Sequence, residues 1–232
     1  MIDKTVETAD EALRDVEDGA TIMFGGFVSA GTPSNLILAL QRRGTKRITG
    51  IANNIGFGDK LDVLCEKRQL AKFIATFAIR ASGGRQSLFE QLYRRGEVEL
   101  ELVPQGTFVE RIRSGGAGLG GVLTRTGLGT MVQGQDGKQT VTVEGTEYLL
   151  EKPLRADFAF IKAWKADRMG NLVYRRTGRN FNPAMATAAD IVIAEVEEIA
   201  NVEELDPERI GTPGVYVDRV VQCEPVAVRW DG

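Results

Sequence analysis

Residues 18–33 read DGATIMFGGFVSAGTP, and this stretch decides the fold. Its apolar run at 20–24 predicts a buried strand. A glycine-rich turn follows at 25–31, after which we expect Thr32 to cap a second helix that Pro33 opens. A strand, a glycine turn and a helix start in this order can form a ligand site, because free backbone N–H groups there attract anions. The spacing alone supports a tight turn, which needs glycine for positive φ angles, equally well.

Strands and helices continue to alternate outward from this stretch through the first hundred residues. Apolar runs predict strands at 47–52, 71–77 and 98–103, and amphipathic segments predict helices at 61–67 and 87–95. Strict alternation of strands and helices indicates a largely parallel sheet covered by helices. The prediction is therefore an α/β fold with an open, mainly parallel sheet flanked by helices.

The pattern changes at residues 115–137, a glycine-rich stretch that predicts a long functional surface loop. Residues 140–150 then predict a β-hairpin. Beyond the hairpin we expect strands at 158–164, 191–196 and 215–221 and a short helix at 183–189. No repeat or linker divides the chain, so residues 1–232 are predicted to form a single domain with the hairpin as an excursion.

The composition excludes several classes of function. A net charge of −3 disfavours a nucleic-acid binder. The count of 0 His removes the Ser-His-Asp and Cys-His nucleophile systems, and with 2 Cys a metal site is not expected. Both cysteines are expected to be reduced thiols. No apolar run approaches the roughly 20 residues of a membrane span, and no signal peptide is seen, so a cytoplasmic protein without membrane contact is expected.

Residues 116–121 formally match the dinucleotide motif G-x-G-x-x-G. A dinucleotide site needs a strand before this motif and a helix after it. Here the motif instead follows the predicted helix at 108–113, so we reject a dinucleotide site and expect a flexible loop. The phosphate-binding P-loop motif is absent from the sequence.

Three amide side chains follow predicted strands: Asn53 and Asn54 after one, and Gln105 after another. Such amides are often only turn formers. Their alternative role is to donate hydrogen bonds to an oxyanion that develops during a reaction. Residues 180–183 are expected to form a helix-entry turn, and the carboxylates within 194–198 are expected to be solvated charges at a strand end.

Taken together, segments along most of the chain resemble the A (alpha) subunit of class I CoA-transferases. The resemblance covers roughly residues 3–221. Its segments are Asp18-Gly19, Gly25-Gly26-Phe27, Gly31-x-Pro33, Asn53-Asn54, Val103-Pro104-Gln105-Gly106-Thr107, residues 110–118, Thr126-Gly127-x-Gly129-Thr130, residues 154–159, Lys162-Ala163, Gly170-Asn171-Leu172, residues 179–183 and Thr212-Pro213-Gly214.

This resemblance implies a CoA-transferase-like fold and an enzyme that moves coenzyme A from an acyl-CoA to a carboxylic acid. The family's nucleophile is a glutamate of the B (beta) subunit, within a Ser-Glu-Asn-Gly motif that this chain lacks. The chain therefore resembles half of an enzyme, active only with its B subunit, in an expected α2β2 heterotetramer with ping-pong kinetics. No tightly bound cofactor is implied, because coenzyme A enters as part of the substrate.

The resemblance also implies roles for particular residues. Gln105 would support the oxyanion, and Asn53 and Asn54 would line the acyl pocket. The CoA-contacting loop would comprise Gly25, Gly26, Phe27, Val28, Ser29, Ala30 and Gly31. Val28-Ser29-Ala30 departs from the family's commoner glycine-containing filler, and Ile55 stands where the family usually has Ala.

The substrate stays open between two branches of the family. Residues 118–124 most resemble the acetate/acetoacetate CoA-transferases, whereas residues 21–27 fit the 3-oxoadipate enzymes equally well. A short-chain acyl or 3-oxo acid is expected, with acetyl-CoA or succinyl-CoA as examples of the donor. The alternatives are the A subunit of a 3-oxoadipate CoA-transferase, a non-catalytic CoA-binding paralogue and, less favoured, a sugar-phosphate isomerase of similar architecture.

Overall fold

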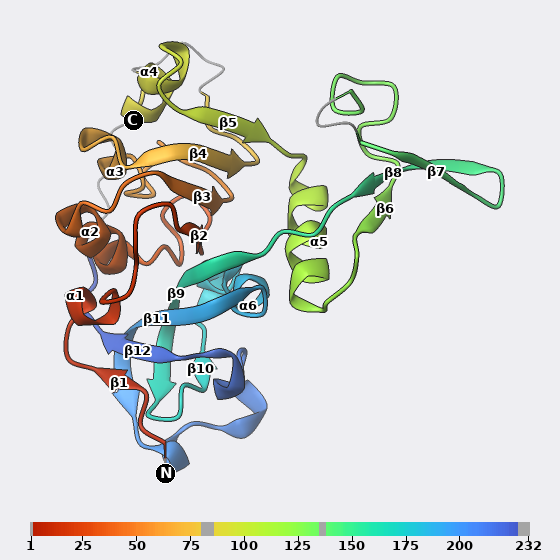
Figure 1. The fold of residues 1–232 in the computed structure, drawn as a ribbon. Helices are drawn as coiled ribbons and strands as arrows, with labels where there is room; N and C mark the ends of the chain where they lie inside the picture. The colour runs from red at the N-terminus through yellow and green to blue at the C-terminus, as the bar shows by residue number, and fades with distance from the viewer. Residues whose placement is uncertain (1, 80–85, 135–137, 227–232) are drawn as a thin grey trace.

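A parallel sheet forms the body of the protein (Figure 1). The computed structural model describes residues 2–79, 86–134 and 138–226. Within them the main sheet has the strand order β1-β12-β11-β9-β2-β3-β4-β5, and β10 pairs with β9. Every pairing along that order is parallel, and only β10 runs antiparallel to its neighbour. The predicted α/β fold with a mainly parallel sheet is confirmed.

The first half of the chain supplies one side of this sheet and the helices beside it. The strands are β2 (Thr21–Phe24), β3 (Ile48–Ala52), β4 (Leu70–Ala75) and β5 (Glu99–Leu102). The helices are α1 (Ala9–Ala12), α2 (Ser34–Arg43), α3 (Val63–Glu66) and α4 (Leu88–Arg94). These helices lie together on one face of the sheet (Figure 1).

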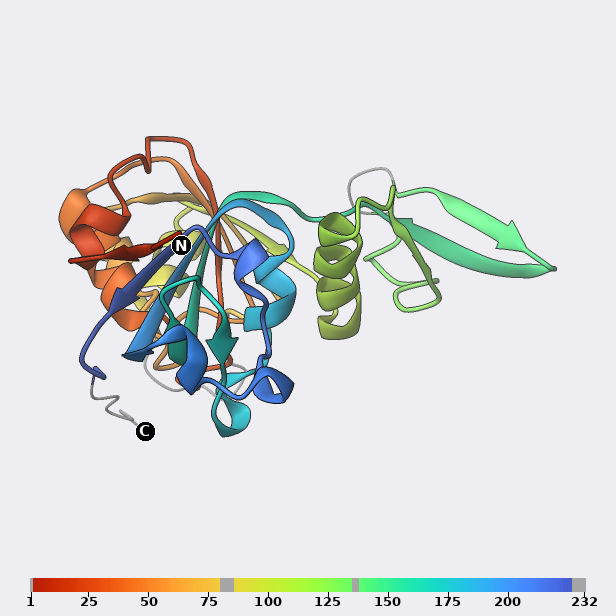
Figure 2. The same cartoon turned by 90° about the horizontal axis from the view of Figure 1, so that it is seen from below.

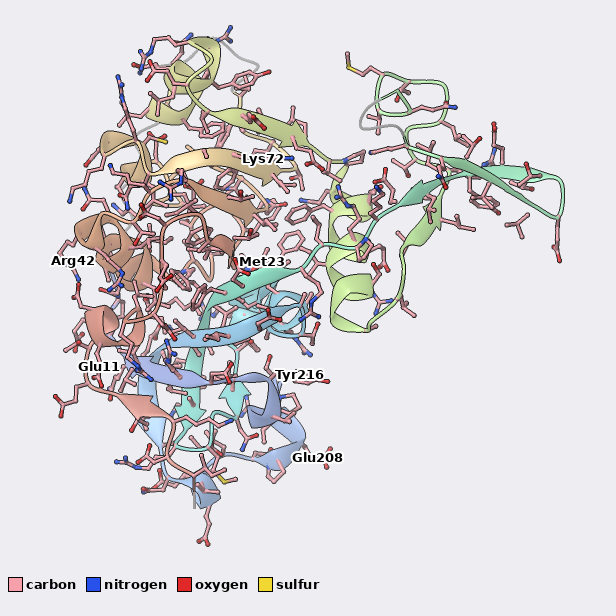
Figure 3. The ribbon with its side chains drawn as sticks, in the orientation of Figure 1. Glu11, Met23, Arg42, Lys72, Glu208 and Tyr216 are labelled. Carbon is pink, nitrogen blue, oxygen red and sulfur yellow. The ribbon has the colours of Figure 1, made fainter. Side chains whose placement is uncertain are left out.

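Alternating side chains of each strand enter two separate cores, as expected for a sheet buried on both faces. On β2, Ile22 and Phe24 pack with Leu36 and other side chains of α2. Met23, between them, joins the opposite core with Phe108. Figure 3 shows Met23 within the main sheet.

The second half of the chain supplies two strands of 12 residues each, β9 (Ala156–Asp167) and β11 (Ala189–Ala200). Phe160 of β9 pairs with Phe24, the last residue of β2, so β9 continues past the end of β2. The remaining strands are β1 (Thr5–Val6), β10 (Leu172–Val173) and β12 (Arg219–Gln222). Helix α6 spans Asn182–Ala186, and 3-10 turns lie at Arg176–Gly178, Val202–Glu204, Pro207–Arg209 and Gly214–Tyr216.

An arm projects from this body in both ribbon views (Figures 1 and 2). Helix α5 (Gln105–Gly116) leads into it, and the arm is an antiparallel sheet of β6 (Val122–Thr124), β7 (Thr140–Val143) and β8 (Thr146–Glu151). The predicted hairpin at 140–150 is confirmed. The loop predicted at 115–137 is wrong in part, because α5 continues to Gly116 and β6 pairs with β8; residues 135–137 lie outside the described residues.

Ion pairs connect the arm to the main sheet. Arg111 on α5 contacts Glu101 on β5 at 2.8 Å, and its Nε lies 4.0 Å from Glu151 at the end of β8. Lys72 on β4 reaches the same Glu101 at 2.8 Å. The Lys72 side chain is labelled in Figure 3. Since Arg111 and Glu151 are both buried, removal of either one would leave the other charge uncompensated away from water.

Several element boundaries differ from the predictions, and three of them bear on the site or on the end of the sheet. Helix α5 begins at Gln105, so this residue opens a helix instead of lying in a turn after a strand. The helix expected at 183–189 ends at Ala186, because β11 already begins at Ala189. The strand expected at 215–221 starts only at Arg219, after a 3-10 turn. Among the described residues, no helix has the length and hydropathy needed to cross a membrane.

Candidate active site

Strands β2 to β5 end at the same edge of the sheet, because they run parallel. The chain segments that follow these ends are residues 25–31, Asn53 with Asn54, Thr76, and Gln105. Crevices at the carboxyl ends of parallel strands are where α/β proteins generally bind ligands. The predicted site residues therefore meet at the edge where a ligand is expected.

Residues 25–31, the glycine loop, form a compact turn above β2. Phe27 and Ala30 exchange two backbone hydrogen bonds of 3.0 Å. Between them, Val28 adopts a φ of 53°, in the left-handed region that β-branched residues avoid. The backbone N–H of Val28 donates to Asn54 Oδ1 at 2.9 Å, which ties the loop to the end of β3.

The glycines of this loop are required by the protein's own packing. A Cβ on Gly25 would overlap the side chain of Asn182, and a Cβ on Gly31 would overlap the carbonyl of Gly178. Gly26 has a φ of +112° and packs against Thr32. These contacts account for all three glycines without a ligand, so the CoA-contacting role of the loop stays a prediction.

A chain of side-chain amides links the predicted site residues. Gln105 Nε2 donates to Asn53 Oδ1 at 2.7 Å, and Asn53 Nδ2 donates to Asn54 Oδ1 at 2.9 Å. Asn54 Nδ2 in turn donates to Asp59 Oδ2 at 2.6 Å. We call these four side chains the amide relay. It joins positions from three segments of the chain into one hydrogen-bonded unit.

The members of the relay differ in exposure. Asn53 and Asn54 are 0% and 3% exposed, whereas Gln105 is an exposed residue at the start of α5. In this chain, Gln105 is therefore the relay residue that can meet a substrate directly. The pocket-lining role of Asn53 and Asn54 stays a prediction, and their observed contacts are with other side chains and the glycine loop.

Asp59 completes the relay and was missed by the sequence analysis. It is 2% exposed and accepts hydrogen bonds from the backbone N–H groups of Gly56, Phe57 and Leu61 at 3.0–3.3 Å. Burial raises the pKa of this carboxyl to about 6, against the opposing effect of these hydrogen bonds. The sequence does offer a signal for Asp59, because this carboxylate follows Gly56 and Gly58 and precedes α3 in the segment after β3.

Glu195 contradicts the expectation of solvated strand-end charges. It is 0% exposed, and its carboxylate contacts Lys162 Nζ at 3.0 Å on the neighbouring strand. The same carboxylate accepts from the backbone N–H groups of Asn35 and Leu36 at 2.8 and 3.2 Å. Glu195 therefore caps α2, and the predicted cap Thr32 does not; Thr32 Oγ1 donates to Val28 O instead.

Asn182 holds the far end of the glycine loop. This residue opens α6, as expected for a helix-entry turn, and it is fully buried. Its Nδ2 donates to the carbonyls of Gly31 and Gly178 at 3.0 and 2.9 Å. Its Oδ1 accepts from the backbone N–H of Lys162 at 2.9 Å. The second half of the chain thus supports the loop from behind.

A hollow of about 420 Å³ opens beside the loop. Ala30 and Gly31 of the loop line it, together with other residues that include Lys162, Trp164, Tyr174, Arg175, Arg176 and Glu197. Arg175 lies over the Trp164 ring and pairs with Glu197 at 3.1 Å. Arg176 is exposed with a φ of 52°. Lys162 is paired with Glu195 and Arg175 with Glu197, so Arg176 carries the excess positive charge of the described lining, and an anion fits this hollow better than a cation.

Comparison with known proteins gives consistent matches across the chain. The family model of coenzyme A transferase matches residues 6–223. The A subunit of 3-oxoadipate CoA-transferase from Acinetobacter baylyi is 48% identical over 225 residues, which is 97% of this chain and 96% of that protein. The A subunit of a probable succinyl-CoA:3-ketoacid coenzyme A transferase from Bacillus subtilis is 46% identical over 94% of this chain and 89% of that protein.

Solved structures show the same fold at lower identity. An acyl-CoA transferase of Escherichia coli O157:H7, solved as a thioester complex with CoA, has a TM-score of 0.83 at 21% identity. This chain is covered completely in that match but spans about half of the other protein, 49%. Glutaconate coenzyme A-transferase of Acidaminococcus fermentans has a TM-score of 0.84 at 22% identity, over 94% of this chain and 75% of that one.

Proposed function

The chain belongs to the coenzyme A transferase family, and from this premise we propose that it is the A subunit of a heteromeric enzyme that transfers CoA to a 3-oxo acid. Its partner would be a B subunit that carries the nucleophilic glutamate, because the chain itself has no Ser-Glu-Asn-Gly segment. Such a partner is supported by the names of the relatives, which are themselves A subunits. We propose an α2β2 assembly in the cytoplasm.

The proposed reaction exchanges acyl groups on the partner's glutamate. The carboxylate attacks the thioester carbonyl, the C–S bond breaks, and CoA leaves as a thiolate with an acyl-glutamyl anhydride behind it. The thiolate then attacks the glutamyl carbonyl, which releases the first acid and leaves a glutamyl-CoA thioester. The acceptor carboxylate repeats these steps in reverse, giving ping-pong kinetics. Carboxylate nucleophiles and thiolate leaving groups need no proton shuttle, in keeping with the count of 0 His.

Gln105 supplies the oxyanion donor in this proposal. One Nε2 hydrogen is held by Asn53, which orients the exposed amide. Amide Nε2 carries two hydrogens, so the second remains to donate to the oxygen that becomes negative when the thioester is attacked. The 2.7 Å hydrogen bond from Gln105 to Asn53 supports this role most directly, because a donor that is oriented in advance stabilises charge without reorganisation.

The glycine loop and the adjoining hollow would receive coenzyme A. The loop contacts the relay through Val28 and Asn54 on one side, and lines the basic hollow through Ala30 and Gly31 on the other. We propose that Arg175 and Arg176 bind phosphate groups of CoA there, since guanidinium groups pair well with phosphate oxygens.

Two acceptors fit the relatives. Relatives from Acinetobacter baylyi and Pseudomonas putida are named for 3-oxoadipate, which carries a second carboxylate, and others for 3-ketoacids. A reconstituted complex should be assayed with succinyl-CoA and acetyl-CoA as donors against 3-oxoadipate, acetoacetate and acetate. Transfer to a 3-oxo acid at higher kcat/KM than to acetate is expected. A preference for acetate would contradict the proposed acceptor class, and CoA binding by an assembled complex without any transfer would favour the non-catalytic paralogue.

A further inference from the structure

The amide relay has a defined direction. An ionised carboxylate can only accept hydrogen bonds, whereas a side-chain amide both donates and accepts. Asp59 accepts from Asn54 Nδ2, so the carbonyl of Asn54 must face the other way, towards Asn53 and the backbone N–H of Val28. The same logic then turns the carbonyl of Asn53 towards Gln105.

The orientation of Asn53 depends on this direction. Its other side-chain contact is Thr76 Oγ1, which lies 3.0 Å from Asn53 Oδ1 and 2.8 Å from the Asn53 backbone carbonyl. A hydroxyl can donate or accept, so Thr76 does not by itself decide which way the Asn53 amide turns. Asn54 decides it, and Asn54 is held between the Asp59 carboxylate and the Val28 N–H.

From this arrangement we infer that Asp59 is a positioning residue that fixes the Gln105 amide through Asn54 and Asn53. The inference rests on the proposed function, because it assigns the Gln105 amide to the oxyanion. In this arrangement Asp59 touches no substrate. Together with the backbone N–H of Val28, which can only donate to Asn54 Oδ1, it sets the sense of the hydrogen bonds in the relay and so holds Gln105 anchored through Nε2 in one orientation.

An Asn side chain cannot replace the Asp59 carboxylate without pointing its NH2 group at other hydrogen-bond donors. Asp59 Oδ2 faces Asn54 Nδ2 and the N–H of Phe57, and Oδ1 faces the N–H groups of Gly56 and Leu61. Whichever way Asn is turned at position 59, its NH2 group meets two donors. The buried site then relaxes either by turning Asn54 or by shifting the loop at 56–61, and both changes disturb the relay.

The test is Asp59→Asn in the complex reconstituted with the B subunit. We expect kcat to fall about 10-fold to 100-fold with a smaller change in the KM for acyl-CoA, as for other small losses of active-site geometry. In a Gln105→Ala background the same substitution should lower kcat less than about 2-fold further, because the anchored amide is already gone.

Asp62→Asn is the matched control. Asp62 lies three residues away and its carboxylate also accepts from backbone N–H groups, those of Leu88 and Phe89, at 2.9 and 2.8 Å. These hydrogen bonds hold the start of α4 and not the relay, so the substitution should lower the melting temperature without the selective fall in kcat. Asn53→Ala, which cuts the relay without touching the contacts of Asp59, should reproduce the effect of Asp59→Asn and carries the test if that variant does not assemble.

Equal effects of Asp59→Asn and Asp62→Asn on kcat would overturn the inference. So would a fall in kcat that persists undiminished in the Gln105→Ala background, or an Asn53→Ala complex with wild-type kcat. Failure of the proposed function looks different, since the assembled wild-type complex would then transfer no CoA at all.

Discussion

Gln105 donates from Nε2 to Asn53 Oδ1 across 2.7 Å, although 52 positions separate the two residues in the chain. Asn53 is fully buried after β3, whereas Gln105 is exposed at the first turn of α5. A rigid buried amide thus orients an exposed one at the carboxyl edge of the sheet. This contact is the structural observation on which the proposed role of Gln105 rests.

Substitution of Gln105 by Glu should remove the oxyanion donor while changing the size of the side chain little. The new carboxylate would repel the developing negative charge, so kcat of the reconstituted complex should fall about 10²–10³-fold, with a much smaller rise in the KM for acyl-CoA. Gln105→Ala should act in the same direction but more weakly, because water can partly replace the amide. The measurement is steady-state kinetics beside a melting curve of each complex.

Gln105 has a second possible role as the residue that opens α5. In that case both variants would lower the melting temperature or weaken assembly, and kcat per assembled complex would stay constant. An unchanged kcat in an intact complex would show that Gln105 is not part of the oxyanion site.

Substitution of Glu195 by Gln should destabilise the chain. The carboxylate pairs with Lys162 and caps α2 from within the core, so the variant leaves a partly buried cation unpaired. We expect a loss of about 3–5 kcal/mol in the free energy of unfolding, measured by urea denaturation. The control is Glu198→Gln on the same strand, where the carboxylate paired with Lys165 is exposed and the pair is worth at most about 1 kcal/mol. Equal losses in the two variants would refute a structural role for Glu195.

Substitution of Val28 by Gly should raise stability. Val28 has a φ of 53°, and relief of this left-handed conformation is worth about 1–2 kcal/mol. The greater freedom of glycine in the unfolded chain offsets up to about 1 kcal/mol of that gain. The free energy of unfolding should therefore increase by up to about 1 kcal/mol, because the hydrogen bond from the backbone N–H of Val28 to Asn54 is retained.

The matched control for Val28→Gly is Gly26→Ala in the same loop. Gly26 has a φ of +112°, and a Cβ there would overlap Thr32, so this variant should be less stable than the wild type. A loss of stability in Val28→Gly comparable to that in Gly26→Ala would mean that the Val28 side chain contributes more than its backbone strain costs.

The sequence already predicts that the candidate residues lie close together. Each candidate follows a strand, and parallel strands bring their carboxyl ends to one edge. Asn53, Asn54 and Gln105 could therefore be expected to meet before any contact was known. The glycine loop was found in the same way, from a strand, a run of glycines and a helix in sequence.

Other features depended on contacts that no local pattern reveals. Glu195 lies in a run of carboxylates typical of a solvated strand end, yet it caps a helix 160 positions away. In the sequence Asp59 resembles an ordinary turn residue, and only the structure shows that its carboxylate accepts hydrogen bonds from Asn54 and from three backbone N–H groups. The glycine content of residues 115–137 predicts a loop. Helix α5 nevertheless extends to Gly116, and its last two glycines are explained by close packing, of Gly115 against Leu154 and of Gly116 against Thr187.

The transferase activity of three samples tests the central claim most directly: this chain by itself, a B subunit with a Ser-Glu-Asn-Gly segment by itself, and the two combined. The chain lacks the proposed nucleophile, so we expect no CoA transfer from either protein in isolation and robust transfer to a 3-oxo acid from the mixture, accompanied by a stable heteromer in light scattering. Robust transfer by this chain in isolation, with its purity verified by mass, would contradict the account, as would a chain that stays monomeric in the presence of the B subunit.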